Sequence, residues 1–148
     1  MRRTLRVMKK AIIILLVGLM ATLCFGASNG FAVITWDDGL VHTVDTDLST
    51  WDFDVYDNVN PPYEPTKVNV LYGGKMSTVK TYENTRVNSS GGFIGALYAY
   101  ENTELSNSGG EINWLYSYNS TYTTVNGGYF QQLLSYDNSK IGTVNLIV

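Results

Sequence analysis

The sequence predicts an all-β protein: a right-handed parallel β-solenoid (β-helix) of about five coils of 18 residues, preceded by a signal-peptide helix. Three observations lead to this prediction. A repeat with a fixed 18-residue period fills the second half of the chain, and its residue types suit strands and turns. The N-terminus has a basic flank followed by an apolar run, which indicates export.

The N-terminal segment, residues 1–32, is predicted to be a secretory signal peptide. Five basic residues lie within its first ten positions, and an apolar run covers residues 11–25. This order is typical of signal peptides, and the run is shorter than the about 20 residues that a membrane-spanning helix needs. The small and polar residues that follow favour cleavage after Ala32, with cleavage after Ser28 as the alternative. An uncleaved N-terminal anchor helix is the other interpretation.

The charge of the remaining chain excludes some partners. Five of the ten basic residues lie in the signal peptide and all thirteen acidic residues lie after it, so five positive and thirteen negative charges leave a mature net charge near −8. We therefore expect no nucleic-acid partner, and no membrane partner once the signal is cleaved. Cys24 is the single cysteine, so the mature chain forms neither disulfides nor thiolate metal sites.

Residues 33–63 are predicted to form an irregular N-terminal coil, or cap. Residues 33–36 and 41–44 have the composition of strands, and Asp37-Asp38-Gly39 between them suits a tight turn. Terminal repeats of solenoids are usually atypical, which agrees with the loss of the regular period here. Residues 60–63, with two prolines, mark a break before the regular coils.

Residues 64–148 are predicted to form the regular coils, because equivalent residues recur at the same spacing. Tyrosines and glycine pairs both follow the 18-residue period: Tyr82, Tyr100, Tyr118 and Tyr136, and the pairs 73–74, 91–92, 109–110 and 127–128. Leu97 and Ala99 alternate with Tyr98 and Tyr100, so on a strand the small apolar residues face inward and the tyrosines face outward. Leucine-rich and helical repeats are excluded by this composition.

A coil of this length suits three short faces of about six residues each, with coils stacked about 4.8 Å apart. The glycine pairs would supply the positive φ of one corner, and the Asn-Thr or Asn-Ser steps another corner. Asn84, Asn102 and Asn138 would form a broken amide ladder. Residues 141–148 lose the glycine pair, so the C-terminal end is expected to be uncapped. The chain is then expected either to be part of a longer protein or to associate with a partner through an open strand edge.

Two stretches resemble a known group of proteins. The coil 87–103, Val-Asn-Ser-Ser-Gly-Gly-Phe-Ile-Gly-Ala-Leu-Tyr-Ala-Tyr-Glu-Asn-Thr, and the stretch 36–44, Trp-Asp-Asp-Gly-Leu-Val-His-Thr-Val, resemble short-repeat β-helix proteins exported by environmental bacteria. Many members of that group carry a C-terminal PEP-CTERM sorting tail, which is absent here. The resemblance implies a cell-surface or extracellular-matrix role and no established enzymatic activity.

Catalytic and metal-binding chemistry has few candidate residues. Aspartates crowd the first coil, and we interpret them as solvated turn and cap residues rather than as a placed pair of glycosidase carboxylates: Asp37, Asp38, Asp45, Asp47, Asp52, Asp54 and Asp57. Calcium would need oxygen ligands such as Asp45 and Asp47, but the coils lack the aspartates of calcium-binding repeats. His42, the single histidine, is expected to face solvent. We expect no cofactor and no catalytic residue.

The outward tyrosines are the strongest candidate binding residues, because flat rings offer a surface on which sugar rings stack. The candidates are Tyr82, Tyr98, Tyr100, Tyr116, Tyr118 and Tyr136. Stacking between neighbouring coils for stability is the competing interpretation. The sequence thus predicts an exported, extracellular or cell-surface structural protein, with a carbohydrate-binding module on the tyrosine face as the alternative. The expected partners are a second copy of the chain or an extracellular polysaccharide.

Overall fold

The computed structural model describes residues 32–58 and 64–144; the predicted signal peptide, apart from Ala32, and the predicted break at residues 60–63 lie outside them. Within these two ranges the chain forms β-strands, turns and irregular segments, and it contains no helix long and apolar enough to cross a membrane. The strands are β1 (Ala32–Trp36), β2 (Val41–Val44), β3 (Asp47–Val55), β4 (Lys67–Val70), β5 (Lys75–Thr81), β6 (Arg86–Ser89), β7 (Phe93–Ala99), β8 (Glu104–Asn107), β9 (Glu111–Ser117), β10 (Tyr122–Val125), β11 (Tyr129–Ser135) and β12 (Lys140–Val144).

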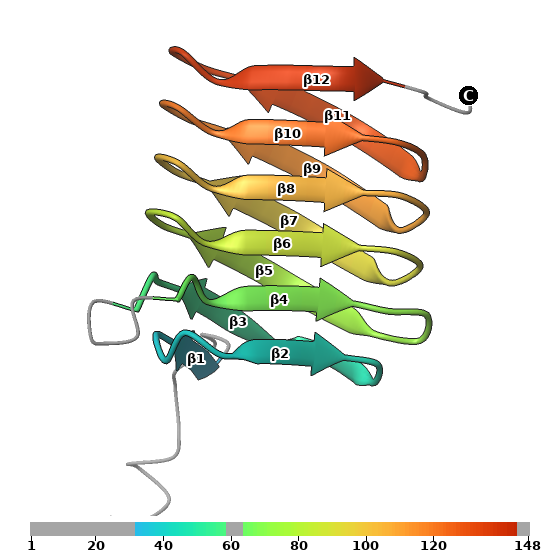
Figure 1. Ribbon diagram of the computed structural model, residues 1–148. Helices are drawn as coiled ribbons and strands as arrows, with labels where there is room; N and C mark the ends of the chain where they lie inside the picture. The colour runs from blue at the N-terminus through green and yellow to red at the C-terminus, as the bar shows by residue number, and fades with distance from the viewer. Residues whose placement is uncertain (1–31, 59–63, 145–148) are drawn as a thin grey trace, which may run out of the picture. The chain divides into compact units, whose positions relative to one another are not determined.

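The strands stack as the predicted parallel β-solenoid (Figure 1). Odd-numbered strands form one six-stranded sheet, the long-strand sheet, in the order β1-β3-β5-β7-β9-β11. Even-numbered strands form the other, the short-strand sheet, in the order β2-β4-β6-β8-β10-β12. The chain passes from one sheet to the other at every turn and winds in a right-handed sense, the usual hand for parallel crossovers. Six strands in each sheet make six turns, one more than predicted.

The prediction of three faces per coil is wrong, because the strands of each coil belong to two sheets and the longer strand is bent. Met76 and Val79 on β5 are both fully buried although they are three positions apart. A regular strand would place them on opposite faces. The pairing of β5 with β7 passes over Ser77 and Gly95, where the strand bends, and this bend turns both side chains inward. The three coils from β5 to β10 therefore each have one bent seven-residue strand and one four-residue strand.

The predicted register is confirmed in the regular coils. Lys75 pairs with Phe93, Phe93 with Glu111, and Glu111 with Tyr129, so each step along the sheet is one full period of the repeat. The first coils depart from this period, since Val41 pairs with Lys67 and the intervening coil is longer than the regular ones. Terminal coils can vary in length because each coil contacts only its neighbours.

Alternation along the strands fills the interior as predicted. Leu97 and Ala99 are fully buried, while Tyr98 and Tyr100 face outward and are half-buried. The core is one continuous column that runs from coil to coil: Val44, Phe53, Val55, Val68, Val70, Met76, Val79, Val87, Ile94, Leu97, Leu105, Ile112 and Leu115. Buried threonines and serines lie beside this column, so the narrow core is part apolar and part hydrogen-bonded.

Two kinds of corner join the sheets. We call residues 71–74, 90–92, 108–110 and 126–128 the glycine corner, and residues 82–85, 100–103, 118–121 and 136–139 the Asn corner. At the glycine corner the predicted positive φ occurs at Gly73 (88°) and Gly128 (84°) but not at the other paired glycines. Close approach between coils requires glycine instead: a Cβ on Gly110 would lie 1.8 Å from the Ser89 Oγ.

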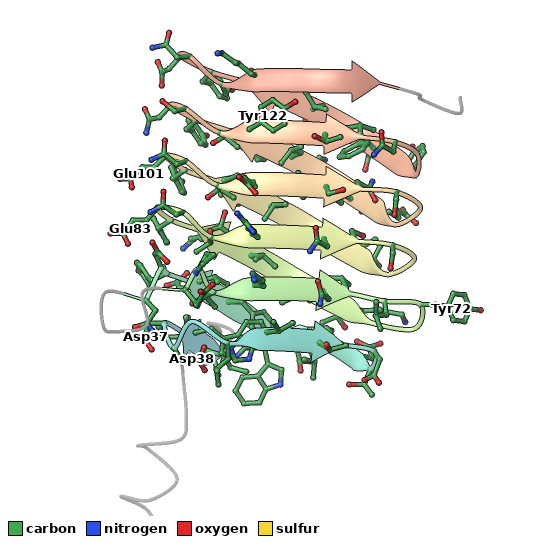
Figure 2. The ribbon with its side chains drawn as sticks, in the orientation of Figure 1. Asp37, Asp38, Tyr72, Glu83, Glu101 and Tyr122 are labelled. Carbon is green, nitrogen blue, oxygen red and sulfur yellow. The ribbon has the colours of Figure 1, made fainter. Side chains whose placement is uncertain are left out.

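Positive φ is found mainly at the Asn corner, where the sequence did not predict it. The residue after each of the four periodic tyrosines, Tyr82, Tyr100, Tyr118 and Tyr136, has a left-handed backbone: Glu83 (61°), Glu101 (58°), Asn119 (55°) and Asp137 (56°). Glu83 and Glu101 lie at this corner in Figure 2. The corner is closed by hydroxyls, since Thr103 Oγ1 donates to the Tyr100 carbonyl at 2.8 Å and Thr121 Oγ1 to the Tyr118 carbonyl at 2.6 Å.

The amide ladder is present in part. Asn102 Nδ2 donates to Asn84 Oδ1 at the long distance of 3.5 Å, and Asn84 Nδ2 donates to the Asp57 carboxylate at 2.8 Å. Within the described residues, Asn138 makes no such bond. At the glycine corner, the buried side chain of Asn107 makes two hydrogen bonds to Gly110. It accepts from the Gly110 amide at 3.0 Å and donates to the Gly110 carbonyl at 3.1 Å.

His42 does not face solvent, and that prediction is wrong. It occupies a β2 position that pairs with Val68, an inward residue, so its ring points toward the end of the core. The His42 and Trp36 rings stack with centroids 4.2 Å apart, and His42 Nε2 lies 2.9 Å from Asp38 Oδ1. Trp36 in turn contacts Phe53. The aromatic pair therefore covers the first-coil end of the core, with Asp38 holding the imidazole.

Candidate functional site

The predicted tyrosine column forms at the Asn corner and is longer than the sequence indicated. Tyr82, Tyr100, Tyr118 and Tyr136 stack face to face with ring centroids 5.2, 4.9 and 5.0 Å apart and interplanar angles of 7–10°. Tyr56 adds a fifth ring, 4.6 Å from Tyr82. We call these five residues the tyrosine ladder. A search for the regular period misses Tyr56, because the irregular coil separates it from Tyr82 by more than one period.

A second, shorter column lies beside the ladder on the outer face of the long-strand sheet. Tyr98 on β7 stacks on Tyr116 on β9 with centroids 4.8 Å apart and an interplanar angle of 7°. The column ends there, because Leu134 pairs with Tyr116 in the next coil and Lys80 pairs with Tyr98 in the preceding one. The structure thus brings the six predicted candidates together as two neighbouring columns.

The stacking determines what these tyrosines offer to a ligand. A sugar stacks on the flat face of a ring. Within the ladder, each inner ring has both faces covered by the rings above and below, and a spacing near 5 Å leaves no room for an inserted ligand. The ladder therefore presents ring edges and hydroxyls. Carbohydrate contact through the predicted tyrosines stays a prediction, and the inner ladder rings could contribute to it only through those edges.

The ladder also changes the acid strength of its phenols. Burial raises the pKa of Tyr82 and of Tyr118 above the ordinary value for tyrosine, because the phenolate is poorly solvated there, and the neighbouring ladder phenols add to the effect. Both side chains stay neutral at physiological pH. Tyr82 and Tyr118 are therefore uncharged side chains on the surface of an acidic protein.

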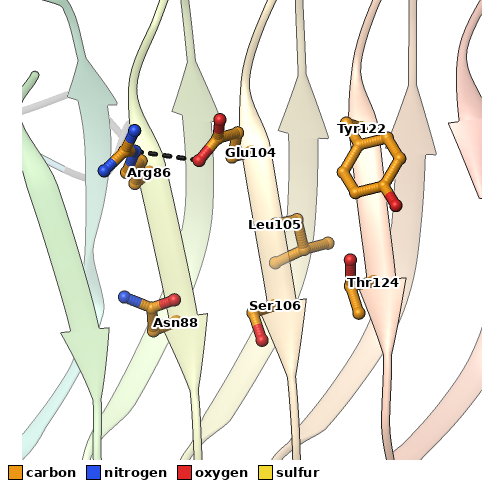
Figure 3. Close-up of a pocket in the computed structure, with 7 residues that line it drawn as sticks. All are labelled: Arg86, Asn88, Glu104, Leu105, Ser106, Tyr122 and Thr124. Atoms are coloured by element: carbon orange, nitrogen blue, oxygen red, sulfur yellow. Dashed lines mark ion pairs between the residues drawn. The ribbon is translucent and has the colours of Figure 1, made fainter. Parts of the chain in front are cut away.

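A groove that the sequence analysis missed crosses the outer face of the short-strand sheet (Figure 3). It has a volume of about 280 Å³ and lies over β6, β8 and β10. Seven residues line it: Arg86, Asn88, Glu104, Leu105, Ser106, Tyr122 and Thr124. We call it the short-sheet groove. Each of its strands contributes one long outward side chain and one short polar one, which gives the groove a wall and a floor.

The wall consists of Arg86, Glu104 and Tyr122, which pair along the sheet. Arg86 Nε donates to Glu104 Oε2 at 2.8 Å, so the two charges neutralise each other. Tyr122 is 50% exposed and stacks on no other ring among the described residues. Its hydroxyl lies over Gly142, where a Cβ would come within 2.9 Å of the phenolic oxygen. Tyr122 therefore keeps a free ring face, unlike the inner ladder tyrosines.

The floor consists of Asn88, Ser106 and Thr124, again one residue from each strand. Asn88 Nδ2 donates to Asn69 Oδ1 at 3.0 Å, which leaves the Asn88 carbonyl oxygen facing the groove edge. The hydroxyls of Ser106 and Thr124 make no hydrogen bond to other described residues. The floor is thus an uncharged row of hydrogen-bonding groups. Its sequence signal is the outward alternation of Tyr122 and Thr124 around buried Thr123.

A second hollow follows the glycine corner. Two connected depressions of about 420 and 550 Å³ share Gly109 and Glu111 and are lined largely by glycine backbone. Tyr72 stands at one end, 91% exposed, and projects from the corner in Figure 2. The amides of Phe93, Glu111 and Tyr129 donate to the preceding coil. These amides stabilise the stack and are not available to a ligand.

The aspartates of the first coils do not form a metal site. Among residues 32–58 and 64–144, no three carboxylate, histidine or cysteine side chains come together in a way that could hold a metal ion. Asp47 instead pairs with Lys75 at 3.0 Å and accepts hydrogen bonds from the Ser49 hydroxyl and amide. These bonds lower the pKa of Asp47 to about 2, with the Ser49 hydroxyl as the largest cause.

Comparison with models of protein families, with curated proteins and with solved structures found no match to this chain.

Proposed function

We propose that this chain is exported and serves as a non-catalytic structural protein of the cell surface or extracellular matrix. The observation that carries the proposal is the tyrosine ladder, in which five outward rings are stacked on one another instead of being left free for a ligand. Aromatic residues that stack on a ligand need an open ring face. In this protein the faces of the inner ladder rings are covered by the tyrosines of neighbouring coils, so the ladder joins each coil to the next.

The rest of the repeat supports the same role. Hydroxyls close the Asn corner, glycines allow close packing at the opposite corner, and parallel strands join every coil to the next. A repeat protein of this kind is stabilised by nearest-neighbour contacts and is well suited to act as a rigid rod. After removal of residues 1–32 its net charge would be near −8, which would keep such rods soluble and apart at neutral pH.

The partners that fit this role are a second copy of the chain and an extracellular polysaccharide. In the described residues β11 and β12 each pair with one neighbour, so one edge of each strand is unpaired. Core residues of the last coil, such as Phe130 and Leu133, are less buried than their equivalents Ile112 and Leu115. Self-association through this end would cover both features.

Localisation and gene deletion in the source cell test the proposal. We expect the product in the medium or on the surface, beginning at Val33 or at Asn29 by intact mass, and we expect deletion to weaken surface or matrix cohesion. Reintroducing the wild-type gene should restore cohesion. An unprocessed intracellular product would overturn the export part of the proposal, and release of reducing sugar ends from a polysaccharide by the purified protein would overturn its non-catalytic part.

A further inference from the structure

We propose that the short-sheet groove binds a neutral polysaccharide chain. The inference goes beyond the structural role, because it assigns a ligand class to Tyr122, Ser106 and Thr124. It rests on a different surface from the tyrosine ladder. Three properties of the groove carry it: a free aromatic face, a row of hydroxyls with no partner among the described residues, and a balance of charge.

The free aromatic face belongs to Tyr122. Among the described residues it is the one aromatic side chain that projects from the outer face of the short-strand sheet, since the other outward positions carry Val41, lysine, arginine, glutamate or small residues. Its ring is half exposed and has no stacking partner in the same part of the chain. An aromatic ring with one apolar face and a polar tip binds a ligand that is itself apolar on one face and hydroxylated at its edge, as a sugar ring is.

A row of two hydroxyls and one amide lies beside that ring and follows the stacking direction. Thr124 pairs with Ser106, and Ser106 pairs with Asn88, so the three groups recur at the strand spacing of about 4.8 Å. Each hydroxyl can both donate and accept a hydrogen bond. A polymer that presents hydroxyls at a short, regular interval, with no charge, matches this row, and an extended polysaccharide is such a polymer.

Charge selects a neutral chain over an acidic one. Arg86, the cation in the wall, is already bound to Glu104 at 2.8 Å, and the floor is uncharged. Lys67 and Lys140 continue the same row on either side of the groove, but residues 32–144 carry thirteen acidic and five basic side chains, so the protein as a whole repels polyanions. A peptide that adds as an extra strand is also a poor match, because β6, β8 and β10 are paired on both edges.

The test uses the protein purified from its source cell, after any natural cleavage. It measures retention of this protein on insoluble cellulose, xylan and mannan, with alginate as the acidic comparison. We expect retention on at least one of the three neutral polymers and none on alginate. Tyr122→Leu should weaken the apparent affinity roughly tenfold, the size expected for loss of one aromatic contact. Thr124→Lys, an outward change that places a bulky charge on the floor, should weaken binding independently.

Two controls separate this groove from other exposed rings. Trp114→Leu removes a ring that is 45% exposed on the outer face of the opposite sheet, and it should leave retention unchanged. The double variant Tyr100→Leu with Tyr118→Leu breaks the tyrosine ladder, and it should also be retained if its circular dichroism shows a folded protein. No retention on the three neutral polymers, retention on alginate alone, or full retention of both Tyr122→Leu and Thr124→Lys would overturn the proposal.

Discussion

At the residue scale, the Asn corner is unusual because non-glycine residues adopt a left-handed backbone there. A non-glycine residue with positive φ is uncommon, and asparagine and aspartate tolerate it best. Two of the four coils place Asn119 and Asp137 there, whereas the other two place Glu83 and Glu101. A glutamate side chain is too long for the local hydrogen bonds that favour this conformation, so those two corners are strained.

Relief of this strain should stabilise the fold. We expect Glu101→Asn to increase the free energy of unfolding by about 0.5 kcal/mol, because asparagine adopts positive φ with less strain. The φ of Glu101 is 58°. Thermal unfolding followed by circular dichroism measures the effect. The matched control is Glu111→Asn at the start of β9, where asparagine is a poorer strand former and should be neutral or destabilising. A lower melting temperature for Glu101→Asn would contradict the prediction.

A second residue-scale prediction concerns acid stability. Because Ser49 and Lys75 stabilise the charged Asp47 carboxylate, its pKa in the folded protein is about 2, below the ordinary value of 3.8. A depressed folded-state pKa contributes stability above the unfolded value, and the contribution is lost as the pH falls from about 4 toward 2. The difference in melting temperature between wild type and Asp47→Asn should therefore shrink over that range. An unchanged difference between pH 6 and pH 2 would argue against this assignment.

At the element scale, the sequence predicted which residues share a column but not how the columns use their surfaces. A fixed period means that Tyr100 lies next to Tyr118, since equivalent positions of stacked coils must be neighbours. It carries no information on whether the rings stack face to face. The bend at Ser77 and Gly95 was missed for a related reason. A coil of three short strands and a coil of one bent and one short strand give the same sequence pattern of inward and outward residues.

Breaking the ladder should destabilise the protein. Tyr100 stacks on both Tyr82 and Tyr118, and each aromatic pair contributes roughly 0.5–1.5 kcal/mol. Tyr100→Leu should therefore lower the free energy of unfolding by about 1–3 kcal/mol, measured by denaturant titration. Tyr122→Leu, which removes an unstacked tyrosine, should change it by less than about 0.5 kcal/mol. Equal losses for the two variants would show that ring stacking does not stabilise the ladder.

The glycine corner offers a paired test of close packing. A Cβ on Gly110 would lie 1.8 Å from the Ser89 Oγ, and that hydroxyl is buried with no hydrogen-bond partner among the described residues. Gly110→Ala alone should lower the free energy of unfolding by more than about 1 kcal/mol. Ser89→Ala should be neutral or stabilising, because it removes an unsatisfied polar atom.

In the double variant, Ser89→Ala should recover part of the loss, since it removes the atom nearest to the new methyl group. The readout is the coupling free energy of the double-mutant cycle, obtained from denaturant titrations of the four proteins. Additive effects would mean that the Gly110 requirement comes from the backbone alone, including the Gly92 carbonyl 3.0 Å from the same Cβ position.

At the scale of the whole molecule, the fold class was predictable, and the surface that we propose to bind a ligand was not. The fixed period and the strand-forming composition predicted the parallel solenoid, which the structure confirms. The number of turns was underestimated, because β1 to β3 form coils without the regular period. The short-sheet groove was missed, because Tyr122 lies outside the repeated tyrosine column and is recognisable only once its strand neighbours are known.

The two ends of the solenoid should differ in local stability. Trp36 and His42 cover the core at the first coil, whereas the core residues Phe130 and Leu133 of the last coil are only half-buried. Backbone amides of β11 and β12 should therefore exchange with solvent faster than those of β7 and β9, as measured by hydrogen–deuterium exchange. Uniform protection from β7 to β12 would contradict this, and in the full chain it would indicate that the last coil is covered.

The tyrosine ladder has a consequence for spectroscopy. Five phenol rings held nearly parallel, 4.6 to 5.2 Å apart, form a one-dimensional array of coupled chromophores. Light absorbed by one ring can migrate along the array before it is emitted, so near-ultraviolet dichroism and fluorescence anisotropy both report on the continuity of the row. Replacing the central ring divides the array into two pairs. The near-ultraviolet signal of the ladder would therefore report, without an attached dye, whether the coils remain stacked in register.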